Sequence, residues 1–270
     1  MTFDWKYMFG LLGDTEFWMA AWTVIQLSVL TWVVSIVLGF VLALAKQSSR
    51  PLLNLPARGY IWLFRSLPLL VLLIFVYNLP QAMPSTSAVL ANPFWAGLIA
   101  LVLSETAYVA EIHRGGLLSI AKGQSEAARA LGLRFAGTQW RIVIPQALRV
   151  ALPSLTNEFI SIVKLSSLVS VISLTEILMV GQRLYSQNFL VMETMAGVAF
   201  FYVLICADRD RVRFPAQTPG ALSGRDPDQG RASAGCRSAA PGHRAPGRRD
   251  ATRQRRDRSR VAGDQAAQGL

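Results

Sequence analysis

Residues 125–145 read SEAARALGLRFAGTQWRIVIP, and this stretch decides how the rest of the chain is interpreted. It is rich in alanine and arginine, and it lies between long apolar runs. Its small side chains would let another surface approach the backbone closely, so it predicts a docking hairpin, with a plain solvated basic hairpin as the alternative. The residues that define the spacing of this stretch are Glu126, Ala127, Ala128, Gly132, Ile142 and Pro145.

Two short helices are expected in this hairpin. Gln124 and Ser125 can cap the first helix, and Glu126 would then lie in its first turn, where the helix dipole favours an acid. Gly132 can end that helix in a left-handed conformation. The second helix is predicted over 136–149, with a bend at its proline, because proline removes a backbone donor.

The composition indicates a membrane protein, since 52% of the 270 residues are hydrophobic and only 16% are charged. A spanning helix needs roughly 20 apolar residues. The predicted fold is therefore an all-α membrane protein with about five transmembrane helices. The first stretch is far longer than the apolar core of a secretory signal. The five stretches are 17–45, 55–79, 94–112, 151–174 and 188–206, the last being short.

Lys and Arg residues set the expected orientation, because cytoplasmic loops carry an excess of them. The connection 80–93 contains no basic residue, whereas the connection between the third and fourth stretches is rich in them. The segment 1–16 is therefore expected outside, and the loop 113–150 in the cytoplasm. The basic residues of that loop are Arg114, Lys122, Arg129, Arg134, Arg141 and Arg149.

The spacing E-A-A, three residues, G, nine residues, I, two residues, P closely resembles the EAA loop of ABC-type import permeases. Three further segments resemble the polar amino acid permeases: FRSLPLLVLLIFVYNLP at 64–80, AYVAEIHRGGLLSIAKGQ at 107–124 and PQALRVALPSLTNEFISIVKLSSLVSVIS at 145–173. In the last segment Ser166 stands where that family usually has Thr. The likeness covers roughly residues 15–205 and implies the type I ABC importer permease fold.

The resemblance implies that the chain is the transmembrane permease subunit of an ATP-driven importer and that it is located in the bacterial inner membrane. Such a subunit moves a polar amino acid across the bilayer by alternating access. It pairs with a second permease subunit, alike or homologous, and its loop seats on one of two ATP-binding subunits. An extracytoplasmic binding protein delivers the amino acid.

No catalytic signature appears in the sequence. It contains no G-x-x-x-x-G-K-[ST] phosphate loop, no H-E-x-x-H and no G-x-S-x-G. We therefore expect that the chain is not an enzyme, holds no cofactor or metal, and relies on ATP bound by a partner subunit.

The coupling residues implied by the resemblance lie in the hairpin, where Arg129 and Arg134 would be charge partners for the ATPase. Candidates for the substrate pathway are polar residues within spans, because ionisable groups are costly in hydrocarbon and normally face the bundle or water. For Lys164 and the serines that follow, an interhelical polar contact is the alternative. His113 is expected to be a solvated loop residue. The coupling set is Glu126, Ala127, Ala128, Arg129, Gly132, Arg134, Ile142 and Pro145. The pathway set is Glu105, Tyr108, Glu158, Lys164, Ser166 and Ser167.

The segment 206–270 departs from the family pattern. After Cys206 every basic residue is Arg or His and every acidic residue is Asp, and this segment carries most of the net charge of +11. A G+C-rich gene read out of frame typically gives such a composition, so a frameshift that replaced the end of the fifth span is one hypothesis. The other is a natural disordered, Arg-rich tail that binds anionic lipid or nucleic acid. For the permease itself no nucleic-acid partner is expected.

Three functions remain open at this stage. The first is an importer permease, and the second is a non-transporting membrane scaffold or sensor that keeps the ATPase dock. The third is a self-contained secondary transporter or channel, which would work without an ATPase. A frameshifted, inactive permease is a variant of the first.

Overall fold

The computed structural model describes residues 3–207, and every regular element among them is a helix. The predictions for 206–270 lie outside the described residues, except that Cys206 and Ala207 form the end of the last helix. The longer helices are α2 (Thr15–Gln47), α3 (Pro51–Ser66), α4 (Leu69–Ala82), α6 (Pro93–Leu118), α9 (Ile144–Leu165), α10 (Ile177–Asn188) and α11 (Val191–Ala207). The shorter elements are α1 (Trp5–Gly10), η1 (Leu11–Gly13), η2 (Pro84–Thr86), α5 (Ser87–Leu90), α7 (Lys122–Ala130), α8 (Phe135–Thr138), η3 (Gln139–Val143) and η4 (Ser166–Ile172).

Three helices within the described part are long and apolar enough to cross a membrane by themselves. They are α2, α6 and the continuous run Phe135–Ile172, which joins α8, η3, α9 and η4. The pair α3 and α4 counts as a fourth span if it is taken together, and α11 is a shorter apolar helix of 17 residues. The described chain is thus an all-α, multi-pass membrane protein.

The second predicted span is not one straight helix. The chain bends by 106° between α3 and α4. Pro68 explains the break, because a proline disfavours the helical conformation in the residue before it, and Leu67 is indeed extended with ψ of 130°. The prediction of a single helix over 55–79 is therefore wrong at this point.

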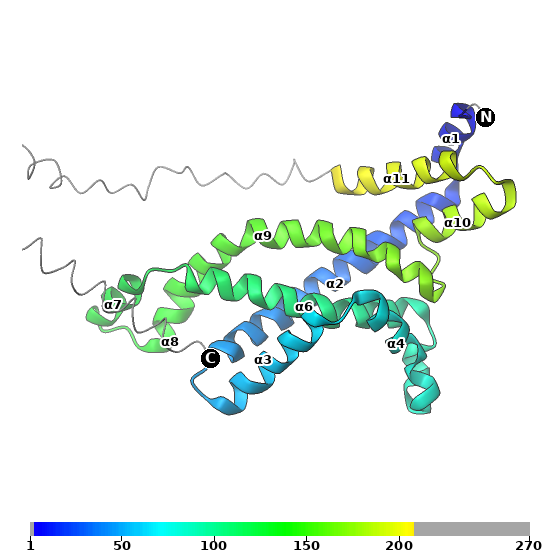
Figure 1. The fold of residues 1–270 in the computed structure, drawn as a ribbon. Coiled ribbons are helices and arrows are strands. Elements are labelled where there is room, and N and C mark those ends of the chain that lie inside the picture. The colour runs from blue at the N-terminus through cyan, green and yellow to red at the C-terminus, as the bar shows by residue number, and fades with distance from the viewer. Residues whose placement is uncertain (1–2, 208–270) are drawn as a thin grey trace, which may run out of the picture. The chain divides into compact units, whose positions relative to one another are not determined.

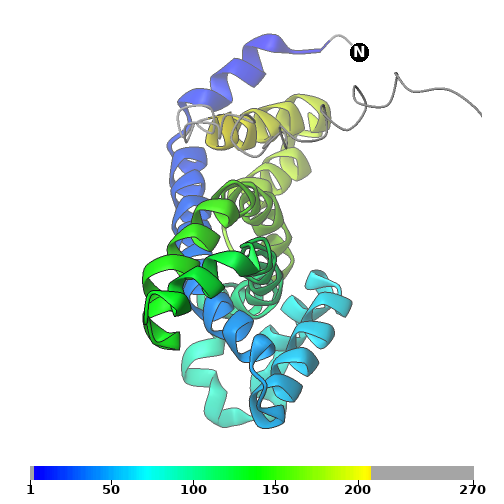
Figure 2. The same ribbon diagram turned by 90° about the vertical axis from the view of Figure 1, so that its left-hand side faces the viewer.

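Helix α6 is the centre of the packing, with α2, α3, α4 and α9 against it (Figures 1 and 2). Glycines permit the closest approaches. A Cβ on Gly39 of α2 would lie 2.8 Å from Cγ1 of Val109, and one on Gly97 of α6 would lie 2.6 Å from Cγ1 of Val169. Small residues at such crossings are the usual means of helix association in a bilayer, where the hydrophobic effect gives little preference for protein over lipid.

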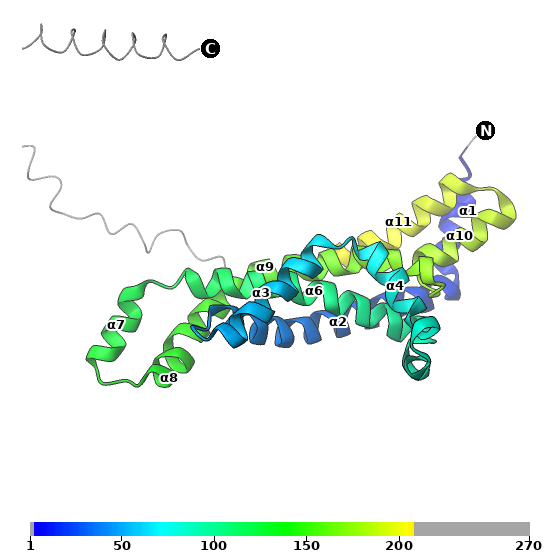
Figure 3. The same ribbon diagram turned by 60° about the horizontal axis from the view of Figure 1, so that its bottom comes forward.

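The two ends of the described bundle differ. At one end α1 and α10 pack on α11, and the backbone N–H of Asp4 donates to Oε1 of Glu193. At the other end α7 and α8 project beyond α6 and α9 (Figures 1 and 3). The hairpin identified in the sequence is therefore separated from the N-terminal helix by the length of the bundle.

Candidate functional site

The first helix of the hairpin, α7, begins earlier than expected. Its N-cap is Ala121, which is extended with ψ of 134° and makes no side-chain capping bond. Gln124 and Ser125 consequently lie inside the helix, and Glu126 falls in its second turn. The chain leaves α6 at Leu118 and turns within three residues, so the tight connection sets the helix start and the capping preference of serine is overridden.

Gly132 ends α7 as predicted. Its φ is +80°, in the left-handed region where a side chain is strained. The N–H of Gly132 donates to the carbonyl of Arg129, and the N–H of Leu133 donates to the carbonyl of Ala128. These two bonds form a Schellman motif and satisfy carbonyls at the helix end. The sharp turn exposes the tip of the hairpin.

The predicted second helix over 136–149 is wrong in extent. The chain forms the four-residue α8, then the π turn η3, and continues through α9 into the fourth span. The N–H of Ile144 donates to the carbonyl of Gln139, which is the wide spacing of a π turn. Pro145 follows at once, and because it has no N–H it cannot donate to the helical carbonyls of the preceding turn. The wide turn also relieves the clash that a proline ring makes with the carbonyl four residues earlier.

The hairpin surface combines exposed charge with exposed apolar side chains. Glu126, Ala127, Arg129 and Arg134 are exposed, whereas Ala128 is buried inside the hairpin. Of the other coupling candidates, Ile142 is half-buried and Pro145 is exposed. Three large apolar residues were missing from the sequence prediction, although their place in a charged loop was a usable signal. They are Leu131, Phe135 and Trp140, with exposed fractions of 84%, 77% and 65%.

Two pathway candidates meet in the interior. Glu105 of α6 is 1% exposed, and its carboxyl group lies near that of Glu158 on α9. Within residues 3–207 the Oε2 atom of Glu105 has no hydrogen-bond partner. Two neighbouring carboxylates repel each other unless a proton or a cation lies between them. The arrangement can therefore attract a cationic group.

The other pathway candidates lie apart from this pair. Tyr108 is 37% exposed and has the guanidinium carbon of Arg65 5.3 Å from its ring centroid, a cation–π contact between α6 and α3. Lys164 is exposed near the end of α9. The hydroxyls of Ser166 and Ser167 donate to the carbonyls of Val163 and Lys164, each at 2.8 Å, so both serines are satisfied within their own helix.

Comparison with known proteins agrees with this geometry. Residues 35–212 match the family described as "Binding-protein-dependent transport system inner membrane component". The chain belongs to this family of permeases.

Relatives of the permease point to amino acid import. It is 42% identical over 184 residues to the octopine transport system permease protein OccM of Rhizobium meliloti. The aligned region covers 66% of the chain and 75% of that relative. It is 34% identical over 200 residues to the glutamine transport system permease protein GlnP of Escherichia coli, covering 70% of the chain and 90% of GlnP. The relatives indicate a permease subunit of an amino acid ABC importer.

Solved structures give the same fold. An amino acid ABC transporter crystallised with histidines matches with a TM-score of 0.71 and 32% identity, over 78% of the permease and 96% of that chain. The inward-facing MetNI methionine ABC transporter matches with a TM-score of 0.57 at 18% identity, which supports the fold alone. The permease has the type I ABC importer fold. It is not an enzyme, since in this family the ATPase is a separate subunit.

A charge cluster that sequence reasoning missed joins α2 to α6 in the permease. Nζ of Lys46 lies 2.5 Å from Oε1 of Glu111, and Nη2 of Arg114 lies 2.8 Å from Oε2 of the same carboxylate. Lys46 and Arg114 each follow an apolar stretch, and both stretches end on the same side of the predicted topology, which was the available signal. His113 beside them is 2% exposed and packs edge-on against Phe40 at 5.4 Å, so the prediction of a solvated loop residue is wrong. Helix α6 continues for five residues beyond it.

A second buried carboxylate organises the opposite end. Glu176 is 1% exposed and caps α10 by accepting from the N–H groups of Leu178 and Met179, each at 2.8 Å. The hydroxyl of Tyr202 on α11 donates to it at 2.7 Å. Burial raises the pKa of Glu176, and these hydrogen bonds oppose that rise. The carboxyl group thereby ties α10 to α11.

Proposed function

We propose that the permease carries a polar amino acid across the bacterial inner membrane by alternating access, driven by ATP hydrolysis in two partner ATP-binding subunits. It would act with a second permease subunit and receive its substrate from an extracytoplasmic binding protein. The hairpin α7–α8 would lie in the cytoplasm, as the basic residues predict. ATP and its binding site would belong to the partners.

The observation that carries this proposal is the hairpin surface. Leu131, Phe135 and Trp140 are all exposed within this short basic hairpin outside the spans, and exposed apolar surface rimmed by polar residues often marks a binding site for a partner. The flanking Arg129, Arg134 and Arg141 are exposed and suit an acidic rim around an apolar groove. Because α7 connects to α6 and η3 leads into α9, a displacement of the hairpin would act on two spans at once.

The carboxyl pair supports the choice of substrate class. Every amino acid brings an ammonium group, and Glu105 with Glu158 would attract it without a permanent cation. Tyr108, Lys164, Ser166 and Ser167 would then line the path along α6, α9 and η4.

A matched pair of glycine substitutions tests the coupling role. Gly132 has a positive φ, whereas Gly123 lies inside α7 with open space around it and ordinary helical geometry. Gly132→Ala combined with Glu126→Ala should abolish binding of the ATPase subunits and uptake, while membrane insertion persists. Gly123→Ala should leave all three unchanged, because alanine favours the helix.

The measurements are amino acid uptake and ATPase activity in vesicles that contain all subunits and the binding protein. ATP-driven uptake that survives the double substitution would contradict the coupling role. Uptake without ATPase subunits would favour a self-contained transporter, and ATPase binding without substrate-stimulated hydrolysis would favour a scaffold or sensor.

An inactive permease is a second candidate, and one observation favours it. The apolar sequence of α11 ends at Ala207, and four charged residues follow directly. A permease with an incomplete fifth span would bind the ATPase through an intact hairpin and fail to transport.

A further inference from the structure

The N-terminal helix α1 lies at the level where two apolar helices begin. The backbone N–H of Asp4, its N-cap residue, donates at 3.2 Å to Oε1 of Glu193, which belongs to the first turn of α11. One turn further along α11, a Cβ on Gly197 would lie 3.0 Å from Cδ1 of Leu11, the residue that follows α1. The span α2 begins shortly afterwards at Thr15. Helix α1 is therefore placed at the membrane boundary of α2 and α11.

Helix α1 runs across the bundle and not along it. In Figure 1 it rises steeply from the end of α2, and in Figure 2, where the central helices are seen nearly end-on, α1 is seen from the side. A helix that lies across the end of a bundle, at the level where the spans begin, has the position of an interfacial helix. Its three faces can be compared with what that position requires.

The first face of α1 is packed on the protein. Tyr7 and Leu11 stand four residues apart and therefore share this face. Nδ2 of Asn188, the last residue of α10, donates to the hydroxyl of Tyr7 at 2.6 Å, and Leu11 is 6% exposed. This packed face attaches α1 to the end of α10 and to the start of α11.

The second face carries two aromatic rings that are largely uncovered in the described part of the chain. Trp5 and Phe9 also stand four residues apart, and their rings stack with centroids 6.4 Å apart. Their exposed fractions are 62% and 59%. The ring of Phe3 lies beside them, with its centroid 4.6 Å from that of Trp5. Helix α1 thus presents an apolar aromatic face at the level of the membrane boundary.

The third face is polar. Lys6 is exposed, and it lies about 100° round the helix from both Trp5 and Tyr7, so it belongs neither to the aromatic face nor to the packed face. Interfacial helices combine a basic polar face with a face of Trp, Phe or Leu that enters the boundary between headgroups and acyl chains. An ammonium group beside exposed rings therefore matches a phospholipid surface.

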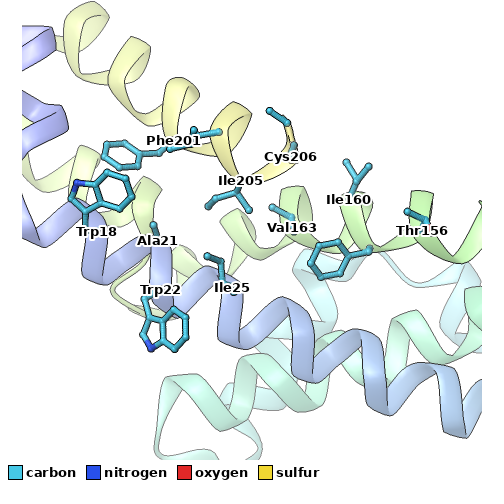
Figure 4. Close-up of a pocket in the computed structure, with 13 residues that line it drawn as sticks. Trp18, Ala21, Trp22, Ile25, Thr156, Ile160, Val163, Phe201, Ile205 and Cys206 are labelled. Carbon is cyan, nitrogen blue, oxygen red and sulfur yellow. The ribbon is translucent and has the colours of Figure 1, made fainter. Parts of the chain in front are cut away.

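The aromatic face of α1 continues a belt of exposed apolar residues on the first turns of α2. Trp18, Met19 and Trp22 have exposed fractions of 52%, 63% and 60%, and they belong to a helix long enough to span. Figure 4 shows the two tryptophans one turn apart on α2, with Phe201 of α11 beside Trp18. The indole N–H of Trp18 donates to the carbonyl of Leu12 at 2.9 Å, which holds the connection from α1 to this belt. Tryptophan is enriched where spans cross the membrane interface, so the belt and α1 meet the same lipid.

We propose that α1 is an interfacial anchor that binds the phospholipid surface of the leaflet farther from the hairpin. Trp5 and Phe9 enter the boundary between headgroups and acyl chains, and Lys6 points to the phosphate groups. Through its packed face the anchor holds the first turn of α11 at a fixed depth, because Asp4 contacts Glu193. The anchor depends on the membrane fold alone and is independent of transport.

The test uses the full chain in lipid nanodiscs, in a background with Cys206→Ser and Cys236→Ser. Nitroxide labels are attached to the variants Trp5→Cys, Phe9→Cys and Lys6→Cys. For each label, the collision rate is measured with oxygen, which concentrates in lipid, and with a nickel chelate, which stays in water. We expect the ratio of oxygen to nickel collisions to be several-fold higher for the labels that replace Trp5 and Phe9 than for the label that replaces Lys6, the control on the same helix.

Two results of this experiment overturn the proposal. Equal ratios at the three positions, with free access of the nickel chelate, would place α1 in water. Labels at positions 5 and 9 that are shielded from both reagents would show that a protein covers the aromatic face in place of lipid.

A measurement without labels decides the case in which a label disturbs α1. The fluorescence of Trp5 is obtained as the difference between the parent chain and Trp5→Phe, which keeps an aromatic ring on the face. Lipids brominated near the headgroup end of their chains should quench this fluorescence, and aqueous iodide should leave it unchanged. Quenching by iodide and not by the brominated lipids would overturn the proposal.

Discussion

The two flanks of α2 differ in composition and in packing. Toward α6 the helices touch so closely that Gly39 has no room for a Cβ, and the side chains of Ser28, Thr31 and Ser35 are fully buried. Toward α11 the same helix borders a cavity of about 820 Å³. Apolar composition alone therefore does not close an interface in a membrane. Close packing also requires small residues in register and a partner of sufficient length.

The side-chain contacts that hold the two flanks lie at opposite ends of α2. The α6 flank is tied by Lys46, Glu111 and Arg114 next to the hairpin. The α11 flank is tied far from the hairpin, where the rings of Phe17 and Phe201 stack with centroids 5.2 Å apart. The ion pairs of the α6 flank therefore lie next to the hairpin, and the aromatic contact of the α11 flank does not.

The largest effect is expected from breaking the close flank. Gly39→Val should lower the free energy of unfolding by about 1–3 kcal/mol, because the added atoms meet Val109 and the backbone of Ala110. The loss of stability is measured by heating each variant in detergent and then determining the folded fraction by size-exclusion chromatography. Gly115→Val is the matched control, since nothing lies within 4 Å of its Cβ. Equal losses in both variants would show that the close contact is unimportant.

The charge cluster gives a smaller effect. Glu111→Gln should cost about 0.5–1.5 kcal/mol, because it removes a carboxylate that is 17% exposed and leaves two cations without it. Glu16→Gln breaks the ion pair with Arg183, in which both side chains are 48% exposed, and should cost about 0–1 kcal/mol. The comparison uses the same unfolding assay. A larger loss for Glu16→Gln would reverse the importance assigned to the two ends.

The smallest effect concerns pH at the α11 flank. The pKa of Glu176 is raised in the folded state, whereas an unfolded Glu titrates at about 4.3. Its contribution to stability is therefore full below about pH 4 and is lost as the pH rises through the folded pKa. The melting temperature should fall over this range, and Glu176→Gln should flatten the fall. An unchanged pH profile in the variant would assign the dependence to other groups.

The turn of the hairpin could be predicted from local sequence. Gly132 adopts the expected left-handed conformation because that requirement concerns one residue and its turn. The start of α7 and the course of the chain past Pro145 could not be predicted in the same way. They depend on where α6 ends and on how a π turn accommodates the proline, and both are set by the neighbouring spans.

The pathway candidates show the same limit. The apolar stretches placed Glu105 and Glu158 within spans, yet nothing in the sequence indicated that the two would lie near each other. Ser166 and Ser167 resembled a functional segment, and their hydroxyls are satisfied within their own helix. The assignment of these residues to a substrate path stays a prediction.

The sequence by itself determined the class of the protein, the positions of its apolar helices and the family to which its loop belongs. These depend on composition, local spacing and short motifs, which are properties of neighbouring residues. Only the tertiary structure decided that the second span is sharply bent, that Lys46 meets Glu111 and that α11 ends beside an open cavity. The physical reason is that the register between helices arises from contacts between distant side chains, and no pattern along one helix specifies it.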